Sequence, residues 1–137
     1  MRSLLDTNIL VYADAGDNRA KQKRAIELIK STRAQGMAVL STQVLQEYVN
    51  VALRKLQLPH SLVRERLNFY RRFELVPASA ELISGALDLH LLHSLSFYDA
   101  LIVQAAVVSG CQRVLSEDMQ HGASFGGVRI ENPFLAS

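Results

Sequence analysis

The sequence has little that would support a disulfide scaffold or a membrane span. It contains one cysteine, Cys111, and no tryptophan. One cysteine cannot form a disulfide within the chain, and it fits a reducing compartment. No stretch approaches the run of about 18 apolar residues that a transmembrane helix needs. The first residues resemble a secretory signal in outline, but Asp6 and Asn8 interrupt the apolar stretch. We therefore expect a cytoplasmic protein that does not enter the membrane.

The sequence also has no internal repeat, low-complexity tract or linker that would divide it. Apolar residues make up 49% of the 137 positions and charged residues 20%, which is typical of a globular domain. A chain of this length buries a sizeable core. We expect one domain over residues 1–137.

Apolar runs that are typical of buried strands alternate with amphipathic segments that are typical of helices. The predicted strands are residues 2–5, 37–40, 73–77, 111–116 and 127–132. The predicted helices are a turn capped by Thr7 or Asn8, and residues 18–35, 42–58, 61–72, 79–93 and 97–109. This alternation predicts an α/β fold, with a mostly parallel sheet of four to five strands and helices on both faces.

Four acidic residues from distant parts of the chain are expected at one edge of that sheet. Asp6 and Asp118 come just after the first and fourth strands, where the carboxyl ends of parallel strands meet. Glu47 lies early in the helix that leaves the second strand at this edge. Asp99 lies in the first turn of a helix that must run opposite to the fourth strand, so it starts at the same edge. The topology therefore predicts a cluster of carboxylates.

Each acidic residue also has an ordinary structural explanation. Ser96 and Asp99 fit a helix capping box, Asp6 can cap the first helix, Glu47 can be a charge at a helix border, and Asp118 can be a solvated loop residue. All four together are harder to explain this way, because clustered carboxylates repel one another. A cation offsets that repulsion, and a site made of oxygen ligands suits Mg²⁺ or Mn²⁺ better than zinc.

Other patterns that carry chemistry are weak here. His90 and His93 lie one turn apart without a third zinc ligand nearby in the sequence. Gly126 and Gly127 indicate a turn rather than a phosphate-binding loop. His121 is near Asp118 and is a candidate for contacting a phosphate.

The acidic motifs, in their order along the chain, carry a family likeness. The segments "LLDTNILVY", "QVLQEYVNV", "SFYDALIV" and "VLSEDMQ" resemble those of PIN-domain ribonucleases, and "GVRIENPF" after "SEDMQHG" resembles the VapC-type toxins of bacterial toxin–antitoxin pairs. The resemblance implies a parallel sheet flanked by helices, an acidic site that binds Mg²⁺ or Mn²⁺, and cleavage of RNA. It also implies a homodimer that a small antitoxin protein inhibits.

Position by position, the resemblance assigns roles to seven residues. The metal-binding and catalytic acids would be Asp6, Glu47, Asp99 and Asp118, the supporting polar residues Thr7 and Asn8, and the hydroxyl residue Ser116. Such a site suits phosphodiester hydrolysis, because bound metal ions lower the pKa of water and stabilise the leaving oxygen. The contribution of Glu117, adjacent to Asp118, stays open.

The charge of the chain is compatible with an RNA substrate. The net charge is +2, and without the four candidate acids nine acidic residues remain against 15 basic ones, which leaves +6. A basic surface favours a phosphate backbone. The candidate RNA contacts are Arg64, Arg71 and Arg72 with Arg66, and a second patch is Arg19, Lys21, Lys23 and Arg24. Solvated helix faces are the alternative explanation.

Three other classes of protein place acidic residues at such an edge. A haloacid-dehalogenase-like phosphatase needs a second acid two residues after the first, where this chain has Asn8. A response-regulator receiver needs an adjacent acidic pair and a lysine at a strand end, which we do not find. The third class is a PIN-like module that binds RNA or protein without cleaving it. The four intact acids count against such a module but do not exclude it.

Overall fold

The computed structural model describes residues 1–135, and residues 136 and 137 of the predicted domain lie outside the described part. Six strands and six helices follow one another within residues 1–135. In chain order they are β1 (Ser3–Leu5), α1 (Thr7–Asp14), α2 (Arg19–Ala34), β2 (Ala38–Ser41), α3 (Thr42–Arg54), α4 (His60–Tyr70), β3 (Glu74–Val76), α5 (Ala80–His93), α6 (Phe97–Val108), β4 (Arg113–Leu115), β5 (Ser124–Phe125) and β6 (Val128–Glu131).

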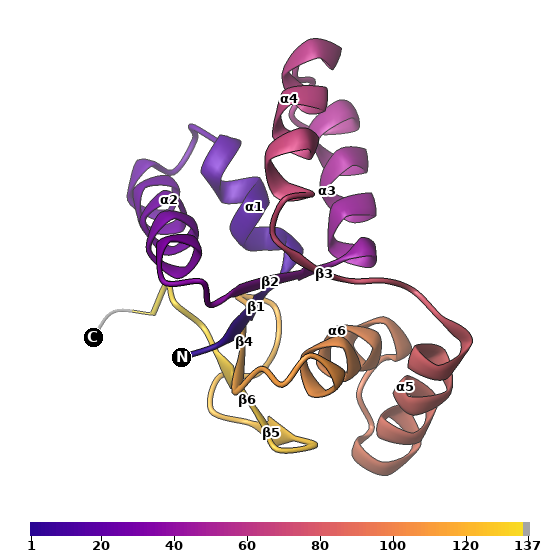
Figure 1. Ribbon diagram of the computed structural model, residues 1–137. Coiled ribbons are helices and arrows are strands. Elements are labelled where there is room, and N and C mark those ends of the chain that lie inside the picture. The colour runs from indigo at the N-terminus through magenta and orange to yellow at the C-terminus, as the bar shows by residue number, and fades with distance from the viewer. Residues whose placement is uncertain (136–137) are drawn as a thin grey trace.

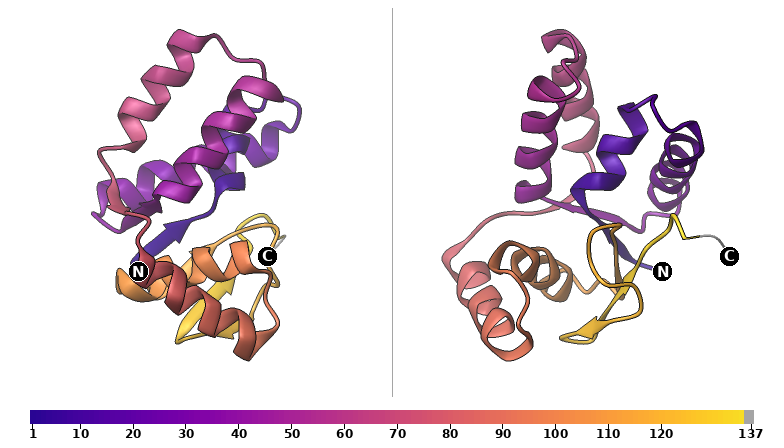
Figure 2. Two further views of the ribbon diagram at one scale, coloured as in Figure 1. Left: turned by 90° about the vertical axis from the view of Figure 1, so that its right-hand side faces the viewer. Right: turned by 180° about the vertical axis from the view of Figure 1, so that it is seen from behind.

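The strands form one sheet in the order β3-β2-β1-β4-β6-β5, and each neighbouring pair is parallel except β5 with β6. Figures 1 and 2 show α1 to α4 on one face of the sheet and α5 and α6 on the other. Because both faces are covered, the central strands are apolar at successive positions instead of alternating. Leu4, Leu5, Val39, Leu40 and Val114 are fully buried. The predicted α/β class and parallel sheet are confirmed.

Helix α6 is the helix that packs most directly under the sheet. It contacts β1, β2, β4 and β6, and α5 covers its outer side. Five of its residues are buried, which explains why its sequence is apolar on nearly every side: Ala100, Ile102, Val103, Ala105 and Ala106. No single helix within residues 1–135 is long and apolar enough to cross a membrane, although α5 and α6, bent by 117°, pass that test as a pair.

The structure differs from the predicted elements in three places. Helix α3 ends at Arg54 instead of at residue 58, and Gln57 beyond it has a φ of 52°, which is not helical. The first helix is a full helix of eight residues rather than a turn, and its N-cap is Asp6 instead of Thr7 or Asn8. The strand β5 was not expected, because two residues are too few to show a hydrophobic pattern. The turn between β5 and β6 is the predicted Gly126-Gly127, with φ of 57° and 81°, a conformation that glycine adopts without strain.

Candidate active site

Asp6 lies between the two central strands of the sheet. The chain adds β2 and β3 on one side of β1 and β4 to β6 on the other, so the strand order reverses between β1 and β4. Asp6 directly follows β1 at this point, where ligands bind in open α/β sheets. Its Oδ1 accepts the Thr7 N–H at 2.8 Å and its Oδ2 accepts the Ser116 hydroxyl at 2.7 Å. The residue is 7% exposed.

The surroundings of Asp6 disfavour its charged form. Burial is the largest cause, and together with the nearby carboxylates of Glu47 and Asp118 it raises the pKa of Asp6 to about 6. The hydrogen bonds from Ser116 and Thr7 act in the opposite direction without cancelling the effect. A cation beside Asp6 would favour the ionised carboxylate.

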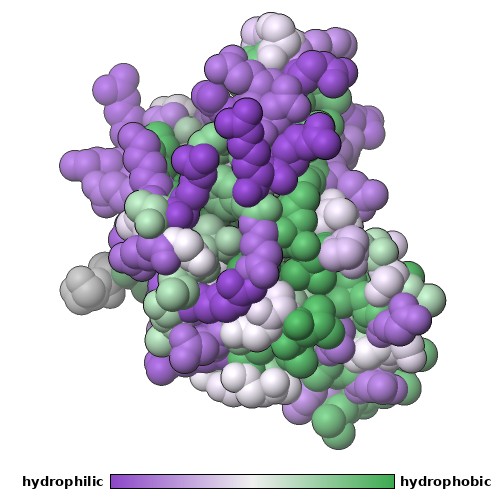
Figure 3. All heavy atoms as spheres, viewed as in Figure 1, coloured by the Kyte–Doolittle hydropathy of each residue, from purple (hydrophilic) through white to green (hydrophobic). Residues whose placement is uncertain are grey.

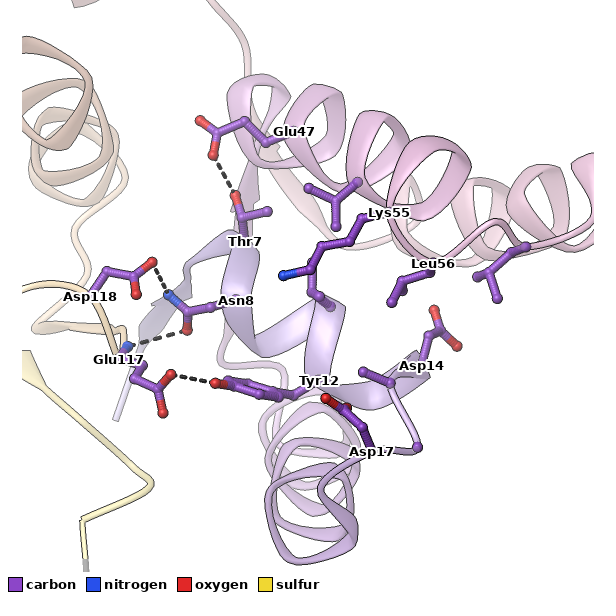
Figure 4. Close-up of a pocket in the computed structure, with 15 residues that line it drawn as sticks. Thr7, Asn8, Tyr12, Asp14, Asp17, Glu47, Lys55, Leu56, Glu117 and Asp118 are labelled. Carbon is purple, nitrogen blue, oxygen red and sulfur yellow. Dashed lines mark hydrogen bonds between the residues drawn. The ribbon is translucent and has the colours of Figure 1, made fainter.

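Glu47 reaches the same edge from the second turn of α3. The Thr7 hydroxyl donates to Glu47 Oε2 at 3.0 Å, as Figure 4 shows. The Gln43 amide, one turn earlier in α3, donates to Glu47 Oε1 at 2.8 Å and to the Tyr98 carbonyl at 3.3 Å. Gln43 therefore links Glu47 to the start of α6. Gln43 was not among the residues predicted from the sequence. Residues four positions apart on a helix lie side by side, so its position relative to Glu47 already indicated that the two side chains can meet.

Asp118 is held to α1 by Asn8. The Asn8 amide donates to Asp118 Oδ2 at 3.2 Å, and its Oδ1 accepts the Glu117 N–H at 3.2 Å (Figure 4). The Ser116 hydroxyl also accepts the Asp118 N–H at 3.2 Å. Asn8 and Ser116 thus fix the loop after β4 against the helix after β1.

Asp99 stands in the first turn of α6, half-buried. The Ser96 hydroxyl accepts the Asp99 N–H at 3.1 Å, so Ser96 caps the helix as expected. Within residues 1–135 the Ser96 N–H does not donate to the Asp99 carboxylate in return, so only one of the two hydrogen bonds of a capping box is formed. The contact between Gln43 and the Tyr98 carbonyl brings this turn beside α3.

Glu117 has its own partners and points away from Asp118. Lys21 donates to Glu117 Oε2 at 2.5 Å, and the Tyr12 hydroxyl donates to Oε1. Burial acts to raise the pKa of Glu117, but these two hydrogen bonds outweigh it and hold that pKa below its usual value. Phe134 packs edge-on against Tyr12, with 5.0 Å between ring centroids. Lys21, a member of the second basic patch, therefore serves as a partner of Glu117.

A groove of about 780 Å³ runs from these acids along α1 and α3. Figure 4 shows its two walls, with Glu47, Thr7, Asn8 and Asp118 at one end. The remaining lining residues are Val11, Tyr12, Asp14, Ala15, Gly16, Asp17, Val51, Lys55, Leu56, Leu58 and Glu117. The carboxylates of Asp6 and Asp99 do not line this groove.

The candidate RNA contacts lie away from the acids. Arg64 is exposed in the middle of α4. Arg71 and Arg72 follow α4 and precede β3, which places them toward the opposite edge of the sheet from Asp6. Arg66 of the same patch pairs with Asp14 at 3.0 Å. The structure thus brings none of the four arginines to the carboxylate edge.

The chemistry of the donor set fits Mg²⁺ or Mn²⁺, because every candidate ligand is an oxygen and the buried Asp6 carries a raised pKa. As the side chains lie, no three His, Cys, Asp or Glu residues within residues 1–135 are close enough together to hold a metal ion. Thr7, Gln43 and Asn8 hold the carboxylates of Glu47 and Asp118 instead. Binding of a metal would therefore exchange these hydrogen bonds for metal contacts.

Comparison with known proteins identifies the family. The family model described as the PIN domain matches residues 3–122. No curated protein sequence matches the chain.

Several solved structures share the fold at low identity. A toxin–antitoxin complex from Klebsiella pneumoniae has a TM-score of 0.71 at 19% identity, over 96% of this chain and 98% of that chain. VapC20 from Mycobacterium tuberculosis, described as a sarcin–ricin loop cleaving toxin, has a TM-score of 0.64 at 19% identity, over 85% and 91%. DNA-bound VapBC from Salmonella typhimurium has a TM-score of 0.67 at 18% identity, over 97% and 98%.

Proposed function

Since the chain belongs to the PIN-domain family, we propose that it is a Mg²⁺- or Mn²⁺-dependent endoribonuclease, acting in the cytoplasm as the toxin of a type II toxin–antitoxin pair. The observation that carries the proposal is Asp6 at the reversal of strand order. Its burial, together with the nearby carboxylates of Glu47 and Asp118, raises its pKa to about 6. The similarity to VapC20, a toxin described as cleaving the sarcin–ricin loop, supports RNA as the substrate.

In this proposal the acidic residues hold the metal and the polar residues hold the acids. Asp6, Glu47, Asp99 and Asp118 are the metal ligands and the catalytic acids. A bound divalent ion supplies charge neutralisation at the phosphate and a water of lowered pKa. Ser116 and the Thr7 N–H keep Asp6 oriented, and Asn8 positions Asp118. One of the carboxylates also accepts the proton of the attacking water.

Metal-dependent RNA cleavage is the direct test. The wild-type protein should cut total bacterial RNA in the presence of Mn²⁺ and not with excess chelator. A variant with Asn at the three Asp positions and Gln at position 47 should be inactive with Mn²⁺. Equal cleavage by both proteins would point to a contaminating nuclease and contradict the proposal. RNA binding without cleavage by the wild type would instead favour the non-catalytic module.

The proposal includes a small antitoxin as a partner, supported by the toxin–antitoxin complexes among the similar structures. The acidic end of the groove suits a basic side chain of such a partner. A small open reading frame encoded immediately upstream, with a DNA-binding N-terminal region, would be the candidate. If the four-acid variant binds that antitoxin as tightly as the wild type, occupation of the acidic site by the antitoxin is excluded.

A second copy of the chain is the other proposed partner. Helix α5 exposes an apolar stripe formed by Ile83, Leu87 and Leu91, which are 49%, 47% and 72% exposed. Figure 3 shows hydrophobic residues gathered over α5 and α6 at the lower right. An exposed apolar face of this kind marks an interaction surface, and a helix face can pair with its own copy about a two-fold axis.

Arg64, Arg71 and Arg72 remain proposed contacts for distant parts of the RNA. Their distance from the acids suits a long substrate rather than the nucleotides at the cleaved bond. Replacing all three by Gln should weaken RNA binding and make it less dependent on salt. An unchanged salt dependence of RNA binding would mean that these arginines contact solvent and not the RNA.

A further inference from the structure

The walls of the groove differ in charge along its length. Glu47 and Asp118 are at one end, and Asp17 lies in the loop after α1 at the other. Two further acids on the groove wall are already paired with cations from elsewhere: Asp14 with Arg66, and Glu117 with Lys21. Among the described residues that line the groove, the acids outside an ion pair are therefore Glu47 and Asp118 at one end and Asp17 at the other.

Lys55 is the one cation among the described residues that line the groove. It is the C-cap of α3, where its N–H donates to the Val51 carbonyl at 2.9 Å. Figure 4 shows its side chain extending from α3 into the groove, with the ammonium group directed toward α1. Within residues 1–135 no carboxylate lies within 4.0 Å of this ammonium group.

An ammonium group that only balanced the acidic groove would be expected to pair with one of its carboxylates. Lys21 and Arg66 do so from outside. Lys55 is exposed, and within residues 1–135 its ammonium group makes no hydrogen bond or ion pair. Lys55 is also separated from Glu47 by eight positions, which is about 12 Å along the helix axis. The groove therefore has an acidic end and, where the Lys55 side chain enters it from further along α3, a site suited to a second anionic group.

We propose that Lys55 binds a backbone phosphate of the RNA next to the scissile one, and so sets the position of the strand in the groove. This inference rests on the proposed ribonuclease function. A strand whose scissile phosphate lies at the acids places a neighbouring phosphate of the same strand along the α1–α3 groove. A lysine contacts such a phosphate as a point charge without reading the base. Lys55 is thus a substrate-positioning residue.

The test compares Lys55→Gln with a matched variant. Arg54→Gln removes one positive charge from the neighbouring exposed position, which does not line the groove. The substrate is a synthetic oligoribonucleotide that spans the principal site at which the wild-type protein cuts total bacterial RNA. We expect Lys55→Gln to raise KM about tenfold with little change in kcat, Lys55→Arg to restore KM, and Arg54→Gln to leave both constants near wild type.

Substrates in which one phosphate is replaced by a neutral group then show which phosphate Lys55 contacts. Oligoribonucleotides with a single methylphosphonate at successive positions are cleaved by wild type and by Lys55→Gln. At one position other than the scissile phosphate, the methylphosphonate should raise the KM of the wild type. The same methylphosphonate should leave the KM of Lys55→Gln unchanged. With the wild type, the slope of log KM against log salt should fall by about 0.7 at that position.

Three results would overturn the inference. Equal effects of Lys55→Gln and Arg54→Gln would mean that only total charge matters. A loss of kcat without a rise in KM would mean that Lys55 acts on the chemical step. Methylphosphonate effects that are the same in wild type and Lys55→Gln at every position would mean that Lys55 touches no phosphate. A wild-type protein that cuts no RNA would instead contradict the proposed function on which the inference rests.

Discussion

At the scale of the residue, Asp6 has two structural roles besides its proposed chemical one. It ends β1 and caps α1 through the Thr7 N–H. The structural explanation offered for this acid, a helix cap, therefore holds, and it does not compete with metal binding. One oxygen faces the backbone of α1 and the other faces Ser116. A cap needs neither burial nor a second acid nearby, whereas the burial of Asp6 and then the neighbouring Glu47 and Asp118 raise its pKa.

The raised pKa of Asp6 predicts how stability depends on pH without metal. Because the folded protein holds this proton up to about pH 6 and the unfolded chain releases it near pH 4, the folded state binds more protons between these values. The free energy of unfolding should then gain up to about 3 kcal/mol from this group as pH falls from 7 to 4. Urea unfolding at several pH values measures this gain.

Asp6→Asn is the control for that measurement, because its side chain does not titrate. The difference in stability between the variant and the wild type should shift in favour of the wild type as pH falls. Added Mn²⁺ should shrink the pH effect in the wild type, because a bound cation favours the ionised carboxylate. A difference that is independent of pH would show that the pKa of Asp6 is not raised.

The variant Asp99→Asn distinguishes two roles of Asp99, that of a metal ligand and that of a charge that interacts with the α6 helix dipole. Ser96 already supplies the cap of α6, so the variant loses only the charge–dipole interaction, about 0.3–1 kcal/mol. Removal of one negative charge from an acidic site offsets part of that loss. Cleavage of RNA should fall by orders of magnitude, and Mn²⁺ should raise the melting temperature less than in the wild type.

Two measurements test Asp99→Asn: the melting temperature with and without Mn²⁺, and the initial rate of RNA cleavage. Ser96→Ala is the matched control, since it removes the cap itself and should cost about 1 kcal/mol while the protein still cuts RNA. An Asp99→Asn protein that cleaves at the wild-type rate would remove Asp99 from the proposed site.

Sequence reasoning could place carboxylates at one edge, but it could not decide where each side chain points. Glu117 and Asp118 are adjacent, and only the structure shows that Lys21 and Tyr12 hold Glu117 while Asn8 holds Asp118. Those partners come from helices that are 96 to 110 positions away in the sequence, so no local sequence pattern indicates them. The metal-ligand roles stay a prediction.

At the scale of the element, a partly buried ionic cluster joins α1 to the α3–α4 pair, and its cation, Arg66, has a side chain that is 37% exposed. Asp14, whose side chain is 6% exposed, accepts from Arg66 Nε at 3.0 Å and from the Tyr48 hydroxyl. Burial and the Asp14 carboxylate both raise the pKa of Tyr48, so its hydroxyl stays protonated and donates. The far end of α1 is thereby fixed against α3, and these two helices form the walls of the groove.

Removing the cation from this cluster should destabilise the protein. Arg66→Gln leaves a buried carboxylate with the Tyr48 hydroxyl as its partner, at a cost of about 1–3 kcal/mol. Asp14→Asn in the same background should recover part of that loss, because the uncompensated charge disappears. Chemical unfolding of the two single variants and the double variant measures the coupling, and additive losses would show that the two side chains do not interact.

The elements themselves were largely predictable because both faces of the sheet are covered. Continuous apolar runs mark β1, β2 and β4, and periodic apolar residues mark α3 and α6. The exception, β5, depends on pairing with β6 across the Gly126-Gly127 turn. That pairing is a tertiary contact, which two residues of sequence cannot encode.

At the scale of the whole molecule, the apolar stripe of α5 predicts self-association. Leu91→Glu places a charge in the middle of an apolar contact, so the proposed dimer should dissociate while the fold, which buries little of Leu91, stays intact. Analytical ultracentrifugation measures the mass of the particle. Leu53→Glu, at an exposed leucine of α3, is the control. A dimer that survives Leu91→Glu while antitoxin binding is lost would assign the stripe to the antitoxin.

The reversal of strand order between β1 and β4 also divides the site between two parts of the chain. Residues before Pro77 supply β1 to β3 with Asp6 and Glu47, and residues after it supply α5 to β6 with Asp99 and Asp118. Neither part holds more than two of the four acids. If the proposed toxin function is correct, a gene split at this point should encode two fragments that are inactive alone. Growth arrest would then report whether two proteins fused to those fragments meet inside a cell.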